Sequence, residues 1–136
     1  MINNKLNNNF SFNGRFFSTI IVILFLQISL FSQIQNGYNV FKYDNGKTSS
    51  EGFIENGKPN GYWKTYHENG NLKSEGNRVN YDLDGLWKFF SVQGFVNLEI
   101  SYQNGLKHGF RKFYSNDSTL VKKEEFVKDT IQHAYK

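Results

Sequence analysis

The chain of 136 residues contains no cysteine. Disulfide bonds, thiolate metal ligands, catalytic thiols and lipid attachment to a cysteine are therefore excluded. Exported domains of about 100 residues often use disulfides to supplement a small hydrophobic core. The stability of this chain must come instead from aromatic packing and backbone pairing, and 18% of its residues are aromatic.

The sequence also lacks the residue clusters on which enzymes and metal sites depend. Its histidines, His67, His108 and His133, stand in different contexts, and none accompanies a candidate nucleophile and an orienting group. Asp82 and Asp84 come closest to a calcium site, but without further acidic ligands at loop spacing they are better explained as turn residues. We therefore expect no enzymatic activity, no cofactor and no bound metal.

The longest hydrophobic run is short for a membrane span. It covers residues 16–31, whereas a transmembrane helix needs about 20 apolar residues. Lys5 and Arg15 precede the run, no acidic residue does, and Ser32 is a small residue at a plausible cleavage point. These features predict a hydrophobic signal helix over residues 1–32 and export to the periplasm or the medium. The alternative is an uncleaved membrane anchor.

The chain carries little net charge once residues 1–32 are removed. The full chain has 16 basic and 12 acidic residues, a formal net charge of +4. Two of the basic residues precede residue 33 and none of the acidic ones does, so 14 basic residues against 12 acidic ones leave +2. Proteins that bind nucleic acid usually carry a dense basic stripe. Lysines and glutamates are interleaved here, and we expect no nucleic-acid partner.

A unit that returns every 24 residues dominates the rest of the sequence. Gly61-Tyr62-Trp63-Lys64 returns as Gly85-Leu86-Trp87-Lys88 and, weakened, as Gly109-Phe110-Arg111-Lys112. Periods of about 20–50 residues are typical of arrays in which one small unit stacks on copies of itself. We assign an array to residues 33–128, with units near 37–60, 61–84, 85–108 and 109–128, and a C-terminal tail to residues 129–136.

Each unit predicts two strands joined by a tight turn. Tyr62–His67 is rich in aromatic residues, Asn69-Gly70 suits a two-residue type I′ turn, and Leu72–Val79 forms the returning strand. A helix is disfavoured because a glycine arrives every six to ten residues and costs about 1 kcal/mol in a helix interior. We expect an all-β fold, an open antiparallel meander of stacked hairpins with about eight strands.

The two-residue turn fixes a register for the hairpin. Two cross-strand pairs of opposite charge follow from it and from the 24-residue shift: Lys64 with Glu75 and Lys88 with Glu99. Tyr66 is placed opposite Lys73. The same shift sets Lys112 opposite Lys123, which is repulsive, so we expect a longer final turn or the end of the array there.

The two faces of the predicted sheet differ. Strand alternation puts Trp63 and Gly76 on one face, where the indole is expected to lie across the glycine, and we expect this face to be buried. The other face carries lysines flanked by aromatic and aliphatic side chains, a candidate surface for a protein or a glycan. Its residues are Tyr62, Lys64, Tyr66, Leu86, Lys88, Phe90, Lys112 and Tyr114. The alternative is that Glu75 and Glu99 neutralise two of the lysines while the aromatic rings pack laterally.

The last predicted strand covers residues 122–128. Charged side chains along an edge strand discourage the addition of foreign strands, and this segment carries several. The alternative is an edge that accepts a partner strand or forms an edge-to-edge homodimer.

The segment EGFIENGKPNGYWKTYHENGNLKSEG, from Glu51 to Gly76, resembles the MORN-repeat variant, whose copies run roughly E-G-x-x-x-N-G-K-x-x-G-x-W-K-x-Y-x-x-N-G-x-L-K. Bacterial chains that carry it are grouped as YwqK-type antitoxin components. The resemblance extends from about Gly37 to Lys128. It implies an elongated, twisted sheet of stacked hairpins that serves as a protein-binding or assembly surface, or that contacts membrane lipids. Tyr81 replaces the glycine of one N-G-K turn, which predicts a different turn type there.

These observations favour a non-catalytic exported module that binds another protein. An alternative is an antitoxin or immunity protein whose partner is a toxin, although an export signal fits poorly with a toxin in the cytoplasm. A further alternative is contact with a membrane surface, which a net charge of +2 would make weak.

Overall fold

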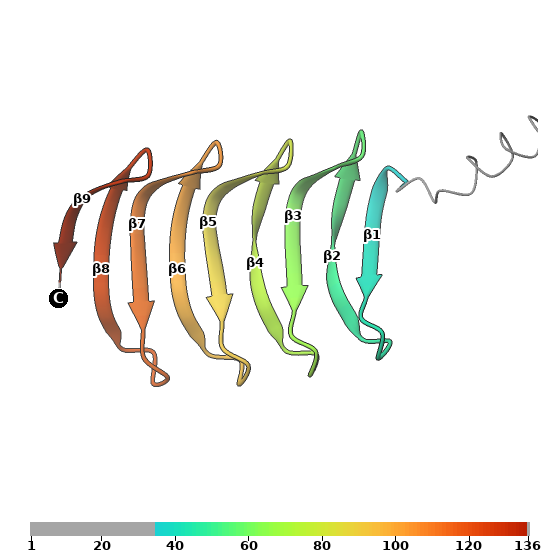
Figure 1. Cartoon of the computed structure of the whole chain (residues 1–136), viewed down its shortest axis with the longest axis horizontal. Helices are drawn as coiled ribbons and strands as arrows, with labels where there is room; N and C mark the ends of the chain where they lie inside the picture. Colours follow the sequence, from blue (N-terminus) through green and yellow to red (C-terminus); the bar gives the residue numbers. More distant parts are fainter. Residues whose placement is uncertain (1–34, 136) are drawn as a thin grey trace, which may run out of the picture. The chain divides into compact units, whose positions relative to one another are not determined.

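The computed structural model describes residues 35–135, which form one antiparallel sheet (Figure 1). Its nine strands pair in sequence order, so the all-β open meander is confirmed, with nine strands rather than about eight. The signal helix predicted over residues 1–32, with its alternative as an anchor, lies outside the described residues. The strands are β1 (Gly37–Lys42), β2 (Thr48–Glu55), β3 (Lys58–Tyr66), β4 (Leu72–Val79), β5 (Asp82–Phe90), β6 (Val96–Gln103), β7 (Leu106–Tyr114), β8 (Leu120–Val127) and β9 (Thr130–Tyr135).

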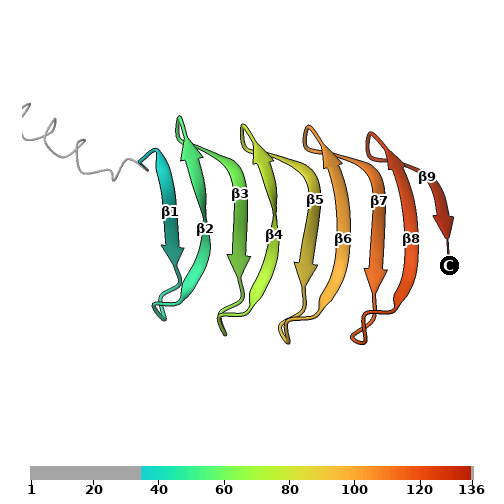
Figure 2. The same cartoon turned by 180° about the vertical axis from the view of Figure 1, so that it is seen from behind.

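Residues 35–135 build a single layer. Figures 1 and 2 show the strands side by side, with β1 at one edge and β9 at the other, and no element of this part of the chain covers either face. Residues 35–135 contain no helix, and so none that is long and apolar enough to cross a membrane. Any burial within these residues must therefore come from side chains that lie flat on the sheet.

The ninth strand forms from residues that were expected to be a C-terminal tail. β9 pairs with β8 from Thr130 opposite Val127 to Tyr135 opposite Lys123. The charged segment in β8 is therefore an interior strand, and its predicted role in protecting the edge is wrong. All six residues of β9 are exposed, and its sequence TIQHAY contains no lysine, arginine, aspartate or glutamate.

The turn at Asn69-Gly70 is longer than predicted. The Gly70 N–H donates to the His67 carbonyl and the His67 N–H donates to the Asn71 carbonyl, both at 2.8 Å. Gly70 has a φ of 96°, whereas Asn69 does not have the positive φ that a type I′ turn requires. The connection is therefore a five-residue loop with one left-handed residue.

The longer loop shifts the register by one residue at its mouth. Tyr66 pairs with Leu72, so the prediction that it lies opposite Lys73 is wrong. Further from the loop the register is as predicted, and two opposite-charge pairs are confirmed as direct cross-strand neighbours: Lys64 with Glu75 and Lys88 with Glu99.

The repulsive pair at the end of the array is present in the fold. Lys112 lies opposite Lys123, and Ser118 closes its turn with an N–H bond of 2.9 Å to the Ser115 carbonyl, as Gly70 does to His67. The final turn, residues 115–119, is a five-residue loop like the one at Asn69-Gly70, so it is not longer than its counterpart. The sheet also continues into β9. The Lys123 ammonium lies 3.7 Å from the centre of the Phe110 ring, a cation–π contact that stabilises its charge beside Lys112.

True two-residue type I′ turns occur at the opposite ends of the strands. Asn56 and Gly57 have φ values of 51° and 73°. Asn80 and Tyr81 have φ values of 50° and 85°, so the prediction of a different turn type at Tyr81 is wrong. The Arg78 guanidinium donates to the Tyr81 carbonyl at 2.6 Å and lies 5.6 Å from its ring centre. The chain therefore holds a tyrosine in the left-handed region that normally takes glycine.

Replacing Tyr81 with glycine is expected to raise the free energy of unfolding by about 0.5–1 kcal/mol. A left-handed conformation costs an L-residue about 1–2 kcal/mol, part of which is offset by the greater freedom of glycine in the unfolded chain. Urea denaturation followed by circular dichroism measures the change. The control is Tyr81→Ala, which keeps a Cβ in the strained conformation and should give no gain. A loss of stability in the glycine variant would contradict this account.

The buried side chains lie on the face that carries both tryptophans, here called the Trp face, as predicted. They are Ile54, Trp63, Trp87, Ile100 and Phe126. The indoles lie over glycines of the preceding strand. A Cβ on Gly52 would sit 2.6 Å from the Trp63 ring, and a Cβ on Gly76 would sit 2.4 Å from the Trp87 ring. The prediction that Trp63 lies over Gly76 is therefore wrong. Trp63 has a glycine opposite it on each neighbouring strand, Gly52 on β2 and Gly76 on β4, and its indole covers Gly52.

An ion cluster replaces the tryptophan in the next unit. Arg111 occupies the place of Trp87 and binds Glu124, which is only 3% exposed; Lys122 Nζ lies 2.7 Å from the same carboxylate. Lys122 and then Arg111 hold the pKa of Glu124 below its usual range. The carboxylate is thus charged at neutral pH and compensated on two sides, as burial of a charge requires.

Candidate functional site

A row of alternating charges crosses the sheet on the face opposite the tryptophans. Each residue of the row is the direct cross-strand neighbour of the next, from β2 to β7. Cross-strand neighbours point to the same face, about 4.8 Å apart, so like charges recur about every 9.6 Å. We call this row the charge ladder and its face the ladder face. The ladder consists of Glu51, Lys64, Glu75, Lys88, Glu99 and Lys112.

Tyrosine hydroxyls hold two of the ladder carboxylates. Tyr66 donates to Glu51 Oε1 at 2.5 Å, and Tyr114 donates to Glu99 Oε2 at 2.9 Å. Partial burial, together with the adjacent glutamate, raises the pKa of both tyrosines. Partial burial and Glu75 raise the pKa of Tyr62 in the same way. These phenols are therefore protonated at neutral pH and act as fixed donors along the ladder.

Direct ion pairs along the ladder are few. Among residues 35–135, the only one joins Lys112 Nζ to Glu99 Oε2, at 3.8 Å. The alternative prediction, that Glu75 and Glu99 neutralise two lysines, thus holds for register but not for direct contact at Lys64 or Lys88. Both ammonium groups remain available to a partner, within the field of their glutamate neighbours.

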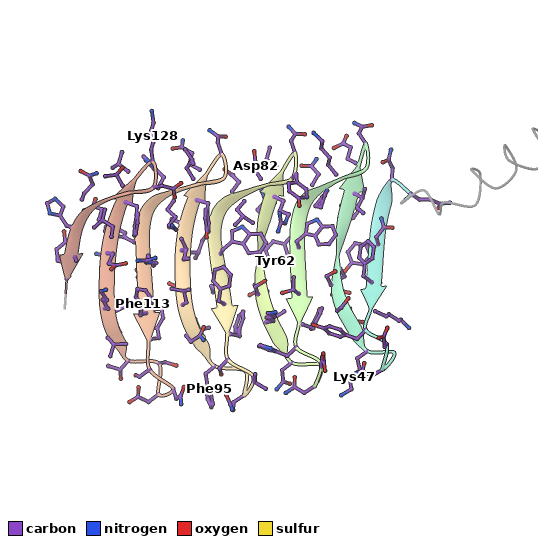
Figure 3. All side chains as sticks on the ribbon, viewed as in Figure 1. Lys47, Tyr62, Asp82, Phe95, Phe113 and Lys128 are labelled. Atoms are coloured by element: carbon purple, nitrogen blue, oxygen red, sulfur yellow. The ribbon has the colours of Figure 1, made fainter. Side chains whose placement is uncertain are left out.

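The structure brings the whole predicted surface together on the ladder face. β3 supplies Tyr62, Lys64 and Tyr66; β5 supplies Leu86, Lys88 and Phe90; β7 supplies Lys112 and Tyr114. Figure 3 shows Tyr62 and Phe113 on the strands between the two rows of connections, with Lys47 and Phe95 at one row and Asp82 and Lys128 at the other. The predicted residues lie on the body of the sheet rather than on its loops.

The ladder face also exposes apolar side chains. Five of its large hydrophobic residues are 48–56% exposed, and the rings of Tyr38 and Phe53 pack in a T-shaped arrangement with their centres 5.3 Å apart. The five are Tyr38, Val40, Phe53, Tyr62 and Leu86. Large exposed apolar side chains bordered by charges are typical of surfaces that another molecule covers.

Sequence reasoning missed part of this surface. Glu51 begins the ladder and accepts the Tyr66 hydroxyl, yet only Glu75 and Glu99 were predicted as partners of the lysines. The 24-residue shift from Glu75 back to Glu51 was the signal that could have identified it. The same shift leads from Tyr62 back to Tyr38, whereas Phe53 lacked such a signal because the positions 24 and 48 residues later are Asn77 and Ser101.

The remaining polar residues lie far apart in the fold. The His67 ring contacts the Phe90 carbonyl at 3.0 Å from its place in a turn, whereas His108 and His133 are exposed on β7 and β9. Asp82 follows a type I′ turn, and its carboxylate lies beside Gly105. Within residues 35–135, no three histidines or carboxylates come together in a group that could hold a metal ion.

Comparisons with known proteins give no match: the chain matches no protein-family model and no curated protein.

Proposed function

We propose that this protein is a non-catalytic module that binds another protein molecule on its ladder face. The observation that carries the proposal is the contrast between the two faces of one sheet. The Trp face covers itself, with Trp87 only 2% exposed, whereas Leu86, its neighbour in sequence, is 49% exposed on the ladder face. A sheet normally buries at least one face against a second layer. On this chain the ladder face is the one that offers apolar area to a partner.

Hydrogen bonds between successive turns hold this surface rigid. At one end the N–H groups of Tyr81, Gly105 and Asp129 each donate at 2.9 Å to the carbonyl of a neighbouring hairpin. At the other end Lys47 Nζ donates to the Asn69 carbonyl at 2.9 Å, and the Asn69 amide donates to the next turn at 3.0 Å. A surface that is ordered before it binds loses little entropy on binding, which favours affinity.

The proposal includes export and kinship with the MORN-repeat variant. The recurrence of one contact 24 residues later supports a repeated unit: Trp63 Nε1 donates to the Phe53 carbonyl at 3.0 Å, and Trp87 Nε1 donates to the Asn77 carbonyl at 2.8 Å. The basic and apolar segment at the N-terminus supports export.

A capture experiment with matched variants tests the binding surface. The tagged chain and its Leu86→Asp variant are incubated with envelope and culture fractions, and the bound proteins are quantified. The variant is expected to retain at most about one tenth of the specifically bound protein that the unmodified chain retains. The reason is that an aspartate at the centre of an apolar interface is desolvated without a partner. Val92→Asp is the control, since Val92 is 51% exposed in a turn away from the ladder. Equal capture by all three chains would contradict the proposal.

A further inference from the structure

The charge ladder has a symmetry that its in-sheet pairing does not require. It has an even number of alternating charges, so it begins with an acid, Glu51, and ends with a base, Lys112. When the order of such a row is reversed, each acid takes the position of a base, so the row is complementary in charge to its own reversed copy. Two copies related by a two-fold axis would therefore set every acid against a base.

From this symmetry we infer that the ladder face binds a second copy of this chain, face to face. The inference rests on the proposed function and names the partner at the same site. The two-fold axis runs parallel to the strands and passes between β4 and β5. Glu75 then faces the partner's Lys88, Lys64 faces the partner's Glu99, and Glu51 faces the partner's Lys112. The strands of the two sheets stay aligned, as in β-sandwiches, whose sheets pack about 10 Å apart.

Side-chain size follows the same symmetry. On the ladder face Tyr62 lies beside Asn77, and Leu86 lies beside Ser101. The two-fold axis sets β3 against the partner's β6 and β5 against the partner's β4. Tyr62 therefore faces the partner's Ser101, and Leu86 faces the partner's Asn77. Large side chains meet small ones, so the two faces can interdigitate.

The available area favours this face over an edge. The two-fold axis sets β1–β8 against the partner's β8–β1, so eight strands overlap over a width of about 38 Å, and strands of mostly eight or nine residues make the overlap about 26 Å long. Full overlap of these strands would cover about 1,000 Å² on each copy, or about 2,000 Å² in total, which lies at the upper end of the usual size of a stable interface. Pairing through β9 would join only six residues.

Two single charge reversals at the axis test the inference. The full chain is studied by sedimentation velocity at low salt, where the wild type is expected to be a dimer. In Glu75→Lys a lysine would face the partner's Lys88, and in Lys88→Glu a glutamate would face the partner's Glu75. Each variant alone is therefore expected to dimerise at least tenfold more weakly. An equimolar mixture of the two is expected to restore the dimer as a heterodimer, because each introduced charge then faces its opposite.

Mixing separates contact between copies from damage within one sheet. Each substitution also places like charges side by side within its own sheet, which circular dichroism and urea denaturation would reveal as lost stability. A second molecule cannot repair that damage, so recovery on mixing arises only from the ladder face. Glu68→Lys is the control, because it makes the same charge change in an exposed turn and should leave the dimer intact.

Three results would overturn the inference: a wild type that stays monomeric up to about millimolar concentration, a dimer indifferent to both reversals, or reversals that mixing does not rescue. Indifference would point to pairing through the β9 edge. A monomer whose Leu86→Asp variant still loses a captured protein would leave the proposed function standing and reject only self-association. A monomer with no capture that depends on Leu86 would reject both.

Discussion

Replacing Trp87 with alanine is expected to lower the free energy of unfolding by about 3–5 kcal/mol. Trp87 is 2% exposed in a sheet of one layer, and its indole covers the backbone at Gly76. It also packs against Phe89 at 6.3 Å between ring centres, under the Arg78 guanidinium at 5.2 Å, and donates to the Asn77 carbonyl. Because no second layer of residues 35–135 can close over the space, the removal also exposes backbone hydrogen bonds to water.

The measurement is urea denaturation followed by far-ultraviolet circular dichroism, since tryptophan fluorescence changes with the substitution itself. Tyr62→Ala is the matched control, because it removes a large ring from the opposite face of the same sheet, where that ring is 52% exposed. It is expected to cost about 1 kcal/mol or less. Equal losses in the two variants would mean that the indole row is not the core of the fold.

The faces and most of the hairpin register could be predicted from the sequence because strand geometry has a period of two. Once Lys64 is set opposite Glu75, Trp63 must lie on the other face. The 24-residue shift then carried this assignment to Lys88 and Glu99, and the structure confirms it.

Turn types were less predictable, because Asn-Gly suits more than one loop. At Asn56-Gly57 both residues are left-handed, whereas at Asn69-Gly70 only the glycine is. The same dipeptide therefore closes a two-residue turn at one end of the strands and a five-residue loop at the other. The flanking strands have eight and nine residues in both cases, so neither the dipeptide nor the length of the strands distinguishes the two loops.

The ladder pairs that join one hairpin to the next could not be predicted, because they too depend on local backbone geometry. Between β2 and β3 the register shifts after Gly52: Gly52 lies opposite Trp63, but Phe53 lies opposite Asn60. β3 therefore carries two extra residues, Gly61 and Tyr62, at this irregularity in the pairing, which bends the backbone. Without knowledge of that irregularity, the pairing of Glu51 with Lys64 between hairpins is displaced, and the ladder breaks into separate pairs.

β9 was missed because its sequence has lost the signature of the unit. Thr130–Tyr135 begins where a unit-initial strand should begin, directly after the turn at Lys128 and Asp129. It contains neither the glycine nor the tryptophan that mark β3 and β5. Its threonine, isoleucine and tyrosine favour a strand on their own, and that weaker signal was the one available.

Replacing Gly76 with alanine is expected to lower the free energy of unfolding by about 1–3 kcal/mol, and the sign of the effect should depend on Trp87. The backbone at Gly76 does not have a positive φ, so the glycine is required by space alone. A Cβ there would meet the indole carbons at 2.4 Å and force the ring off the sheet. With Trp87→Ala already present, the same substitution should be neutral or stabilising by about 0.5 kcal/mol, because alanine is favoured over glycine in a strand.

A double-mutant cycle in urea measures this coupling between the two positions. Gly94→Ala is the control, because Gly94 has a φ of 95° and a Cβ added to it would meet no atom within 4 Å. Its cost is backbone strain and should be the same with or without Trp87. If Gly76→Ala also cost the same in both backgrounds, the indole could not be what selects glycine at this position. A reversal of sign would show that the tryptophan of one strand and the glycine of its neighbour act as one packing unit, the element on which a sheet without a second layer depends.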